Sequence, residues 1–370
     1  CWCVNVKKKS IFDLYYYLKI QIKKIHLIII PNSMMKLFGY TPDGAVVNSY
    51  ELRNKKGMEL NVINYGATVA SLKVPLKTGE FIDVVLGFEN LEGYIKSFQL
   101  KGAPYFGATV GRFAGRINNS TFDLDGKTIL LNKNNNNHSL HGGIANFSQK
   151  VWTVDTINEG NNPSISLSCL SPDNDENYPG DLSIKLTYTV SEENELIIEY
   201  HATTSKDTIV NLTHHSYFNL DGHKSDVLEQ ELIVNSKKRL ETTDENIPTG
   251  KFLNTVDSSF DFSRPKKCPS EIDTTFVLEN KEEFAATLFN PKNKLKMTVY
   301  TNQAGVHIYV GGNCFNEIKG KENGAYNSVS GICFETQNFP DAPNHKHFPN
   351  SVLKKEAVYN HKTIYKFQSL

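Results

Sequence analysis

The stretch DLSIKLTYTVSEENELIIEY, residues 181–200, indicates the fold class of this protein. Between residues 182 and 190, apolar side chains occupy every second position, and Ser, Lys and Thr occupy the positions between them. Successive side chains of a β-strand point to opposite faces, so this alternation predicts a strand with one buried face. The polar sequence SEEN interrupts the pattern and ELIIEY resumes it, which predicts an antiparallel hairpin.

Two other stretches show the same alternation. TFDLDGKTILL, residues 121–131, is predicted to be a hairpin that turns at Asp125-Gly126. KLKMTVYTNQAGVHIYVGG, residues 294–312, is predicted to be a third hairpin. Helical structure is expected only as short turns near residues 90–97 and 281–288.

The remaining chain repeats short strand patterns separated by Gly, Pro, Asn or Asp. No linker or change of composition divides it after residue 35. The sequence therefore predicts an all-β protein, a large antiparallel β-sandwich, with a single domain over residues 36–370.

The first residues have a different composition, rich in Lys, Ile and Tyr. Their apolar runs are too short to span a membrane and no signal-peptide cleavage pattern follows them. Because Met34 and Met35 stand at the change of composition, we expect residues 1–35 to be an extension outside the fold. We expect a cytoplasmic protein, with a periplasmic location or a membrane anchor through Cys1 as the alternative.

Composition narrows the classes of partner. Forty basic residues balance forty acidic ones, which disfavours nucleic-acid and membrane-surface binding. The six scattered cysteines predict neither disulfides nor a zinc site, and no glycine-rich phosphate loop is present in the sequence. HKH, residues 345–347, has the spacing of metal ligands but no third ligand nearby. We therefore expect no metal and no cofactor.

Two adjacent histidines lie in NLTHHSYFNLDG, residues 211–222. On a strand, His214 and Ser216 would share one face and His215 the other, so only one histidine can face a given cleft. The pattern alone does not choose between them. Two structural histidines are the alternative interpretation.

Glu335 lies in GICFETQNFPDAP, residues 331–343, where apolar residues flank it on both sides. The prolines that follow end the strand, so Glu335 is predicted near a rim, where a carboxylate can act as a general base. A carboxylate tied to a neighbouring amide or Lys is the alternative interpretation.

Two further motifs carry polar candidates. In HSLHGG, residues 138–143, two glycines after His141 allow a close approach of backbone or ligand. GRFAGRI, residues 111–117, contains two of the five arginines of the chain, Arg112 and Arg116. A tight turn and ordinary surface charge are the alternatives for these motifs.

Taken in order, these motifs resemble those of one known family. NYGAT, GRFAGRI, HSLHGG, NLTHHSYFNLDG, FETQNFPDAPN and the tail FPNSVLKKEAVYNHKTIYKF are similar to segments of the aldose 1-epimerase (galactose mutarotase) family. The resemblance runs from about residue 37 to the C-terminus. It implies a mutarotase-like β-supersandwich that interconverts the α and β anomers of a free aldose without metal or organic cofactor.

The resemblance also implies a role for individual residues. The catalytic His of the family immediately precedes SYFNL, which makes His215 the general acid, and the Glu of ETQNFPDA makes Glu335 the general base. The second active-site His, in LHGG, is His141, which would support the transition state. Sugar-binding residues are implied at Arg116 and at Asp273 of IDTTF.

This sequence departs from the family pattern at three positions. His307 of HIYVGGN replaces a Gln that commonly contacts sugar hydroxyls, so we expect His307 to bind the substrate. Gly115 stands where some members carry a sugar-contacting Asn, and IDTTF lacks the His that often follows its Asp. An aromatic wall for the sugar is expected from Tyr178 of ENYPG or from Phe113.

Three other functions are weighed against the mutarotase. A hexose-6-phosphate 1-epimerase would need a basic cluster, which five arginines scarcely supply, and a non-catalytic sugar-binding domain would not need an acid–base pair. A lyase or hydrolase is disfavoured, because glycosidases generally use two carboxylates. The expected partner is a small aldose, bound by a monomer or a homodimer.

Overall fold

The computed structural model describes residues 34–280, 282–312 and 317–370. All described residues belong to one compact unit, Asn32–Leu370. The expectation of an extension over residues 1–35 thus falls largely outside the described residues. The first strand, β1, begins at Met35, one residue before the expected start of the domain.

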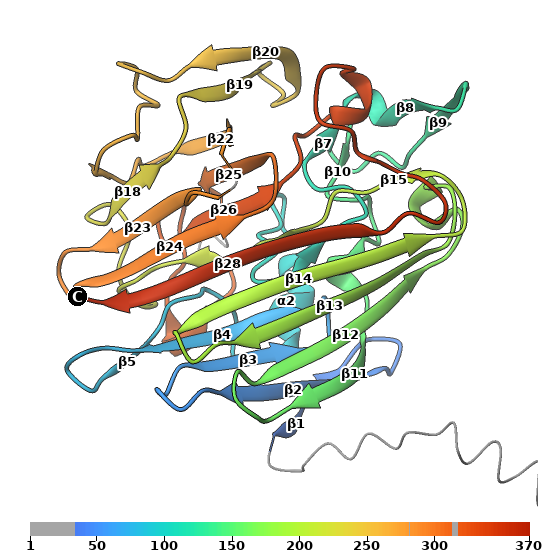
Figure 1. Ribbon diagram of the computed structural model, residues 1–370. Coiled ribbons are helices and arrows are strands. Elements are labelled where there is room, and N and C mark those ends of the chain that lie inside the picture. The colour runs from blue at the N-terminus through green and yellow to red at the C-terminus, as the bar shows by residue number, and fades with distance from the viewer. Residues whose placement is uncertain (1–33, 281, 313–316) are drawn as a thin grey trace, which may run out of the picture. The chain divides into compact units, whose positions relative to one another are not determined.

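Antiparallel strands build the fold, which confirms the predicted fold class. The largest sheet has nine strands (Figure 1). In spatial order they are β11 (Thr153–Asn158), β12 (Ser164–Ser171), β13 (Leu182–Val190), β14 (Glu195–Thr204), β28 (Tyr359–Ser369), β24 (Leu295–Thr301), β23 (Ala286–Asn290), β18 (Glu231–Val234) and β21 (Lys266–Lys267).

A six-stranded sheet carries most of the chemistry described below. Its order is β17 (Tyr217–Phe218), β26 (Ile332–Gln337), β25 (Gly305–Val310), β22 (Ile272–Val277), β19 (Lys238–Thr242) and β20 (Pro248–Asn254). A five-stranded sheet contains β1 (Met35–Tyr40), β2 (Val46–Arg53), β3 (Glu59–Ile63), β4 (Thr68–Pro75) and β5 (Phe81–Asp83).

Four short pairs complete the strands. They are β7 (Arg116–Ile117) with β10 (Ser139–Leu140), β6 (Thr109–Val110) with β16 (Thr213–His214), β8 (Thr121–Leu124) with β9 (Lys127–Leu130), and β15 (Thr208–Ile209) with β27 (Val352–Leu353). The helix α2 (Leu91–Ser97) falls on the helical turn expected near residues 90–97.

Two of the predicted hairpins are confirmed. β13 pairs with β14, and its alternate residues from Leu182 to Val190 are buried as predicted. β8 pairs with β9 through Asp125 and Gly126, whose φ angles of 49° and 77° are the positive values that a tight hairpin turn requires.

The third predicted hairpin is wrong. β24 and β25 are both strands, but β24 pairs with β23 and β28, whereas β25 pairs with β22 and β26. The short connection between them therefore crosses from one sheet to the other. The helical turn expected near residues 281–288 is also absent from its described part, where β23 begins at Ala286.

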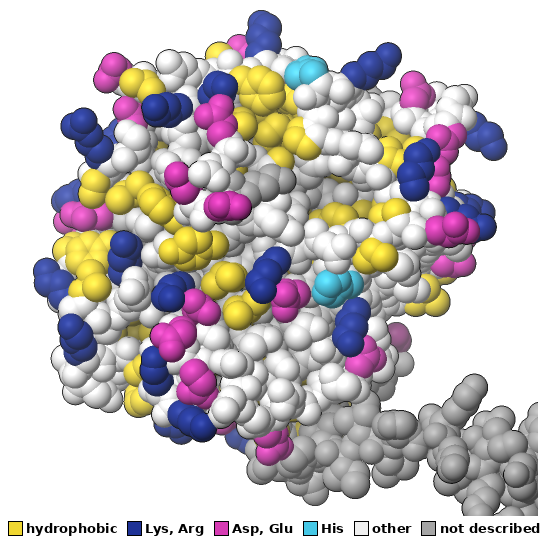
Figure 2. Space-filling model, viewed as in Figure 1, with side chains coloured by type: hydrophobic (Ala, Val, Ile, Leu, Met, Phe, Trp, Pro, Cys, Tyr) yellow, Lys and Arg dark blue, Asp and Glu magenta, His cyan; other side chains and the backbone are white. Residues whose placement is uncertain are grey.

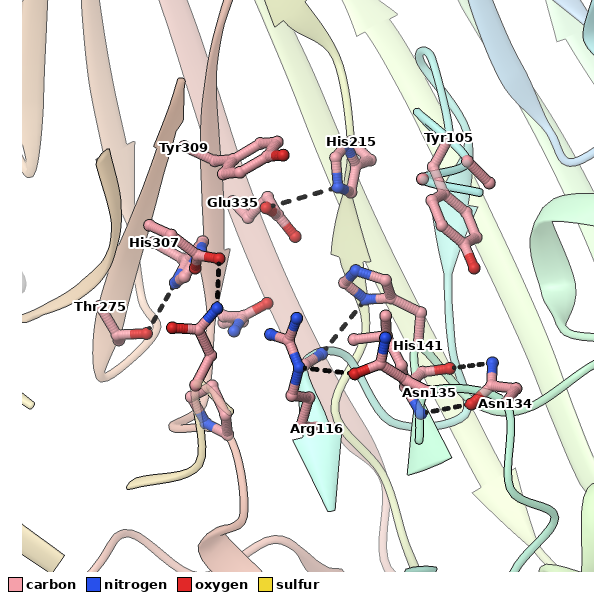
Figure 3. Close-up of a pocket in the computed structure, with 18 of the residues that line it drawn as sticks. Tyr105, Arg116, Asn134, Asn135, His141, His215, Thr275, His307, Tyr309 and Glu335 are labelled. Atoms are coloured by element: carbon pink, nitrogen blue, oxygen red, sulfur yellow. Dashed lines mark hydrogen bonds and ion pairs between the residues drawn. The ribbon is translucent and has the colours of Figure 1, made fainter. Parts of the chain in front are cut away.

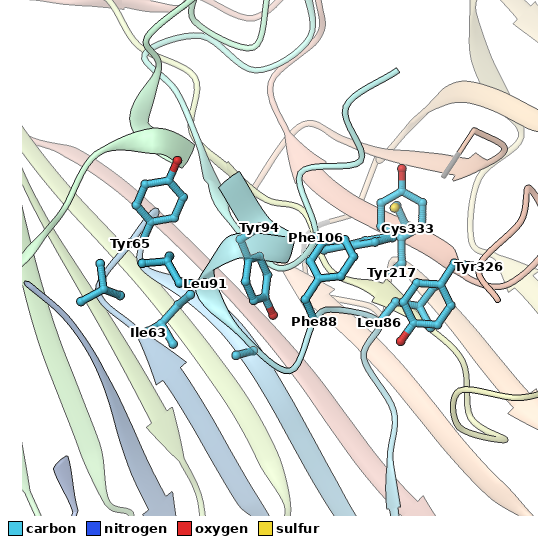
Figure 4. Packing of buried hydrophobic residues seen from close by; sticks show 12 residues of the cluster. Ile63, Tyr65, Leu86, Phe88, Leu91, Tyr94, Phe106, Tyr217, Tyr326 and Cys333 are labelled. Atoms are coloured by element: carbon cyan, nitrogen blue, oxygen red, sulfur yellow. The ribbon is translucent and has the colours of Figure 1, made fainter. Parts of the chain in front are cut away.

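The six-stranded sheet packs on the nine-stranded sheet through aromatic residues. Phe218 lies 4.9 Å from Tyr365 between ring centroids, and the Tyr365 hydroxyl donates to the Phe334 carbonyl oxygen at 2.8 Å. A separate apolar cluster includes Phe106, Tyr217 and Cys333 (Figure 4). Burial of such side chains is the main stabilising contribution to a fold of this kind.

The surface agrees with the balanced charge of the sequence. On the face seen in Figure 2, basic and acidic side chains of the described residues are interspersed. Over residues 34–280, 282–312 and 317–370, no helix has the length and apolar character needed to cross a membrane.

Candidate active site

A cavity of about 360 Å³ opens over one face of the six-stranded sheet (Figure 3). Polar side chains from distant parts of the sequence line it. All but one of the predicted site residues are among them, namely His215, Glu335, His141, Arg116, Asp273 and His307.

Strand alternation places Glu335 in this cavity. Every residue of β26 is buried, because both faces of the strand are covered. Phe334 and Thr336 face the nine-stranded sheet, where the Thr336 hydroxyl lies 2.5 Å from that of Thr363. Glu335 therefore points to the opposite face, and its side chain lines the cavity with 4% exposure.

His215 is held opposite Glu335 by its own backbone. It follows β16, its N–H donates to the Ala108 carbonyl oxygen at 3.0 Å, and its carbonyl oxygen accepts from the Gly107 N–H at 3.0 Å. Its Nε2 lies 3.5 Å from Oε1 of Glu335, and its Nδ1 lies 3.7 Å from Sγ of Cys333. One imidazole thus faces two residues on the same face of β26.

His214 points away from the cavity, as alternation requires. Its Nε2 pairs with the Ser216 hydroxyl at 2.7 Å, and its ring lies 6.0 Å from that of Tyr188. Burial, together with the neighbouring charge of His215, lowers the pKa of His214 to about 3. His214 is therefore a neutral core residue, and of the two histidines only His215 reaches the cavity.

His141 enters the cavity as a neutral hydrogen-bond donor. Burial, followed by the nearby charges of His215 and Arg116, lowers the pKa of His141 well below its ordinary value. The Gly115 N–H donates to His141 Nδ1 at 3.2 Å, so the ring proton lies on Nε2. Gly142 allows this turn, because a Cβ there would lie 2.1 Å from the Gly111 carbonyl oxygen.

His141, His215 and Glu335 are close enough to hold a metal ion, since their potential ligand atoms lie within 4.8 Å of one another. Coordination through Nε2 would move the proton of neutral His141 to Nδ1, where the Gly115 N–H already points. His141 therefore fits a hydrogen-bond donor better than a metal ligand. His345 and His347 instead contact the carbonyl oxygens of Pro248 and Gly250.

The two arginines of GRFAGRI have different environments. Arg116, on β7, lines the cavity and donates from Nε to Oδ1 of Asn135 at 3.0 Å. Arg112 is 2% exposed and donates to the Ser171 hydroxyl and to the carbonyl oxygens of Ser171, Pro172 and Pro179. Arg112 therefore has a structural role.

Asp273 and His307 form an ion pair on neighbouring strands. His307 Nε2 lies 3.0 Å from Oδ1 of Asp273, and its Nδ1 lies 2.9 Å from the Thr275 hydroxyl. Burial alone would lower the pKa of His307, but the hydrogen bond and charge of Asp273 outweigh it and raise that pKa. The same pair holds the pKa of Asp273 below its ordinary value, although burial opposes this.

The two residues predicted for the aromatic wall, Tyr178 and Phe113, are contradicted by the structure. Tyr178 is fully buried in a second apolar cluster with Phe113, and neither residue lines the cavity. The Tyr178 ring lies 5.7 Å from the guanidinium carbon of Arg112. Both aromatic side chains therefore support the core behind the cavity.

The aromatic residues that do line the cavity include Tyr105 and Tyr309, which the sequence analysis missed. Tyr309 is two residues from His307 on β25, so strand alternation could have identified it. Tyr105 lies in a loop with a φ of 51°, and its ring centroid is 5.0 Å from that of His141. No periodic signal marks it.

Gly115 explains one departure from the family pattern. Its φ is 79°, and a Cβ there would lie 2.8 Å from the Pro340 side chain. An Asn at this position would be strained in the present backbone. The amide side chains that line the cavity include those of Asn135 and Asn246.

Comparison with known proteins identifies the family of the chain. The sequence profile of the family described as Aldose 1-epimerase matches residues 48–366. The chain belongs to the aldose 1-epimerase family. Members of this family are isomerases, and the chain is therefore an aldose 1-epimerase by family.

Individual relatives match over nearly the whole domain. Galactose mutarotase from Bos taurus is 37% identical over 343 residues, covering 90% of this chain and 97% of the relative. Aldose 1-epimerase from Escherichia coli K12 is 31% identical, covering 88% and 96%. The solved structure of an aldose epimerase homologue from C. elegans has a TM-score of 0.81 and 31% identity, covering 88% of this chain and 99% of that one.

Proposed function

We propose that this aldose 1-epimerase interconverts the α and β anomers of free hexoses such as glucose and galactose by acid–base opening and closure of the ring. The observation that carries the proposal is the facing pair of His215 and Glu335, 3.5 Å apart and nearly inaccessible to bulk solvent. An acid and a base on one hemiacetal are the minimum that this reaction needs.

Glu335, as a carboxylate, removes the proton of the anomeric hydroxyl while His215, as an imidazolium, donates a proton to the ring oxygen. The bond between C1 and the ring oxygen breaks, and C1 becomes an aldehyde. Rotation about the C1–C2 bond exposes the other face of the aldehyde, and the two residues exchange roles as the ring closes. No atom or electron pair is gained or lost in the cycle.

Donors around this pair support the charge that develops on the two oxygens. Neutral His141 offers its Nε2–H, as its Nδ1 already accepts from Gly115. Arg116 lines the same cavity and adds positive charge. Such fixed donors stabilise developing charge more effectively than water, because they need no reorientation during the reaction.

Asp273 and His307 bind the hydroxyl groups that do not react. Each lines the cavity, and together they offer carboxylate and imidazole edges to the sugar. A partly buried polar pair of this kind disfavours ligands that lack the matching hydroxyls, because the pair would lose water without gaining new partners.

Polarimetry on freshly dissolved α-glucose, α-galactose and glucose 6-phosphate tests the proposal. We expect faster approach to anomeric equilibrium than the spontaneous rate for the free hexoses. No acceleration with any free aldose would overturn the proposal. Sugar binding without acceleration would indicate a binding domain, and acceleration only with the phosphate would indicate a hexose-6-phosphate epimerase.

A further inference from the structure

The run of four asparagines at residues 134–137 forms one edge of the cavity. Asn134 and Asn135 both line it. Asn134 fixes the loop by donating to the Leu140 and Gly143 carbonyl oxygens at 2.9 Å each and accepting from the Leu140 N–H at 2.7 Å. Asn135 accepts from Arg116 Nε at 3.0 Å. The run therefore contacts Arg116, which also lines the cavity.

A second loop, between β19 and β20, forms a neighbouring part of the edge. Asn246 of this loop lines the cavity and donates from Nδ2 to Oδ2 of Asp273 at 3.0 Å. Its φ of 60° is in the left-handed region, which asparagine tolerates better than most residues. The two loops thus each bring one amide to one charged residue of the site.

Glu245 connects the two loops. Its Oε1 accepts from Asn136 Nδ2 at 3.3 Å, and its Oε2 lies 3.4 Å from His138 Nε2. His138 Nδ1 accepts from the Asn119 N–H at 3.0 Å, so in the neutral ring the proton lies on Nε2, which approaches Glu245 without forming a hydrogen bond. The Glu245 side chain, which is 56% exposed, thus contacts the asparagine run from the loop that carries Asn246.

Asn246 lies away from the reacting atoms. Glu335 pairs in register with His307 on β25, and His307 pairs with Thr275 on β22. Asp273 is therefore two strands away from Glu335, roughly 10 Å at the usual spacing between strands. Asn246, beyond Asp273, is placed to reach the end of a pyranose that is remote from its anomeric carbon.

The amides also keep hydrogen-bonding capacity for a ligand. Asn246 uses one N–H on Asp273, which leaves its second N–H and its carbonyl oxygen. Asn135 uses its carbonyl oxygen on Arg116, which leaves its NH₂ group. A sugar hydroxyl both donates and accepts hydrogen bonds. The NH₂ group of Asn135 and the carbonyl oxygen of Asn246 can therefore distinguish the orientation of such a hydroxyl.

We propose that Asn135 and Asn246 are specificity-determining residues that bind sugar hydroxyls that do not react, and that Glu245 is the positioning residue that holds them. The inference rests on the proposed mutarotase function, because it assumes a sugar bound with its anomeric carbon between His215 and Glu335. It adds a second group of residues, from two loops, to the strand-borne acid and base.

The test combines residue changes with removal of single hydroxyls from the sugar. KM and kcat are measured by polarimetry for glucose and for 3-deoxy-, 4-deoxy- and 6-deoxyglucose, with the unaltered protein, Asn135→Ala and Asn246→Ala. We expect each variant to raise KM for glucose by about 3- to 10-fold, the usual effect of one hydrogen bond, with kcat within about threefold. For each variant, one deoxyglucose should lack the hydroxyl that the altered residue contacts. That deoxyglucose should have a higher KM than glucose with the unaltered protein, and its KM should not rise further with the variant.

Matched controls separate recognition from loop stability. Asn137→Ala changes the same run at an exposed side chain that contacts Lys133, and Asn254→Ala changes the opposite end of the β19–β20 hairpin. Both should leave KM unchanged. Glu245→Ala should raise KM for glucose, whereas Glu245→Gln, which can still accept from Asn136, should raise it less.

Calorimetric dissociation constants for the same sugars keep this inference separate from the proposed function. If the protein binds glucose but does not accelerate mutarotation, the proposed function alone is overturned. The dissociation constants of the Asn135 and Asn246 variants then test the inference by themselves. Unchanged affinity in both Asn variants overturns the inference alone. A parallel loss of affinity for glucose and every deoxyglucose also overturns it, because such a loss reports general loosening of the loops.

Discussion

Nε2 of His215 faces Oε1 of Glu335 across 3.5 Å, with 5% and 4% of the two side chains exposed. This separation is longer than a full hydrogen bond, so neither group is fully committed to the other. The carboxylate keeps a lone pair and the imidazole a proton for a third group that enters between them. The pair is therefore arranged to act on a substrate more than to stabilise the fold.

His215→Asn and Glu335→Gln should each lower kcat in polarimetry by roughly 10²–10⁴-fold, because each removes a positioned acid or base. The double variant should lose much less than the product of the two single losses, since both residues act in one event. His214→Asn is the control, and it should reduce thermal stability with little change in kcat. An inactive, folded His214→Asn beside an active His215→Asn would contradict the assignment.

His141→Ala should lower kcat by roughly 10²–10³-fold, the usual effect of losing one donor to a developing oxyanion. His141→Gln should lose less, because its amide can still donate a hydrogen bond from a similar position. The comparison is made by polarimetry at saturating sugar, with circular dichroism as the check on folding. Equal activity of the Ala variant and the unaltered protein would show that His141 makes no contact in the transition state.

Arg112→Met and Arg116→Met should separate structural from functional arginine within one motif. Arg112→Met leaves buried carbonyl oxygens without a donor, at about 1–3 kcal/mol for each such group, and should lower the free energy of unfolding by about 3 kcal/mol or more. Arg116→Met should change stability by less than about 1 kcal/mol but lower kcat/KM. Urea unfolding and polarimetry on both variants measure these effects, and a reversed pattern would refute the division of roles.

His307→Gln should change both sugar preference and the pH dependence of stability. The pKa of His307 is raised above 6.5 and that of Asp273 is lowered below 3.8. The His307 contribution is complete below pH 6.5 and is lost as pH rises through its raised pKa, whereas the Asp273 contribution is present above pH 3.8 and is lost as pH falls through its lowered pKa.

Urea unfolding at a series of pH values should therefore show how much more stable the unaltered protein is than His307→Gln. We expect this difference in the free energy of unfolding to be largest between pH 3.8 and pH 6.5 and to shrink at higher pH. In polarimetry the same variant should alter the ratio of activities on glucose and galactose, with the better kcat within a few-fold. A stability difference independent of pH, or a loss of activity on every sugar, would contradict these expectations.

Local alternation predicts strands well but says little about their partners. The pattern of residues 182–190 is complete within one strand, so β13 and its hairpin could be recognised from the sequence. The alternation of β24 and β25 is equally clear, yet they belong to different sheets. The partners of β24 include β28, which lies far from it in the sequence. A local pattern gives no information about such distant partners.

The candidate site divides in the same way. The presence of Glu335 and His215 in the cavity could be predicted, because alternation puts the two histidines on opposite faces and the resemblance selects His215 and Glu335. Tyr105 and Asn246 lie in loops with positive φ angles, and their contact with the cavity depends on the tertiary fold. Tyr178 failed as a prediction because an aromatic residue near a motif fits a core as well as a sugar site.

The position of β28 has a consequence for biosynthesis. This strand follows all the others in the chain, yet it lies in the interior of the nine-stranded sheet, between β14 and β24 (Figure 1). Until the ribosome has released it, β14 and β24 each present an unpaired edge, which is a template for association with other chains. The sheet can close only late, through contacts between distant parts of the sequence, and such contacts form slowly. A nascent chain stalled before residue 359 would thus expose the unpaired edges of β14 and β24. Chaperones that shield strand edges should matter most between the synthesis of β24 and the pairing of β28.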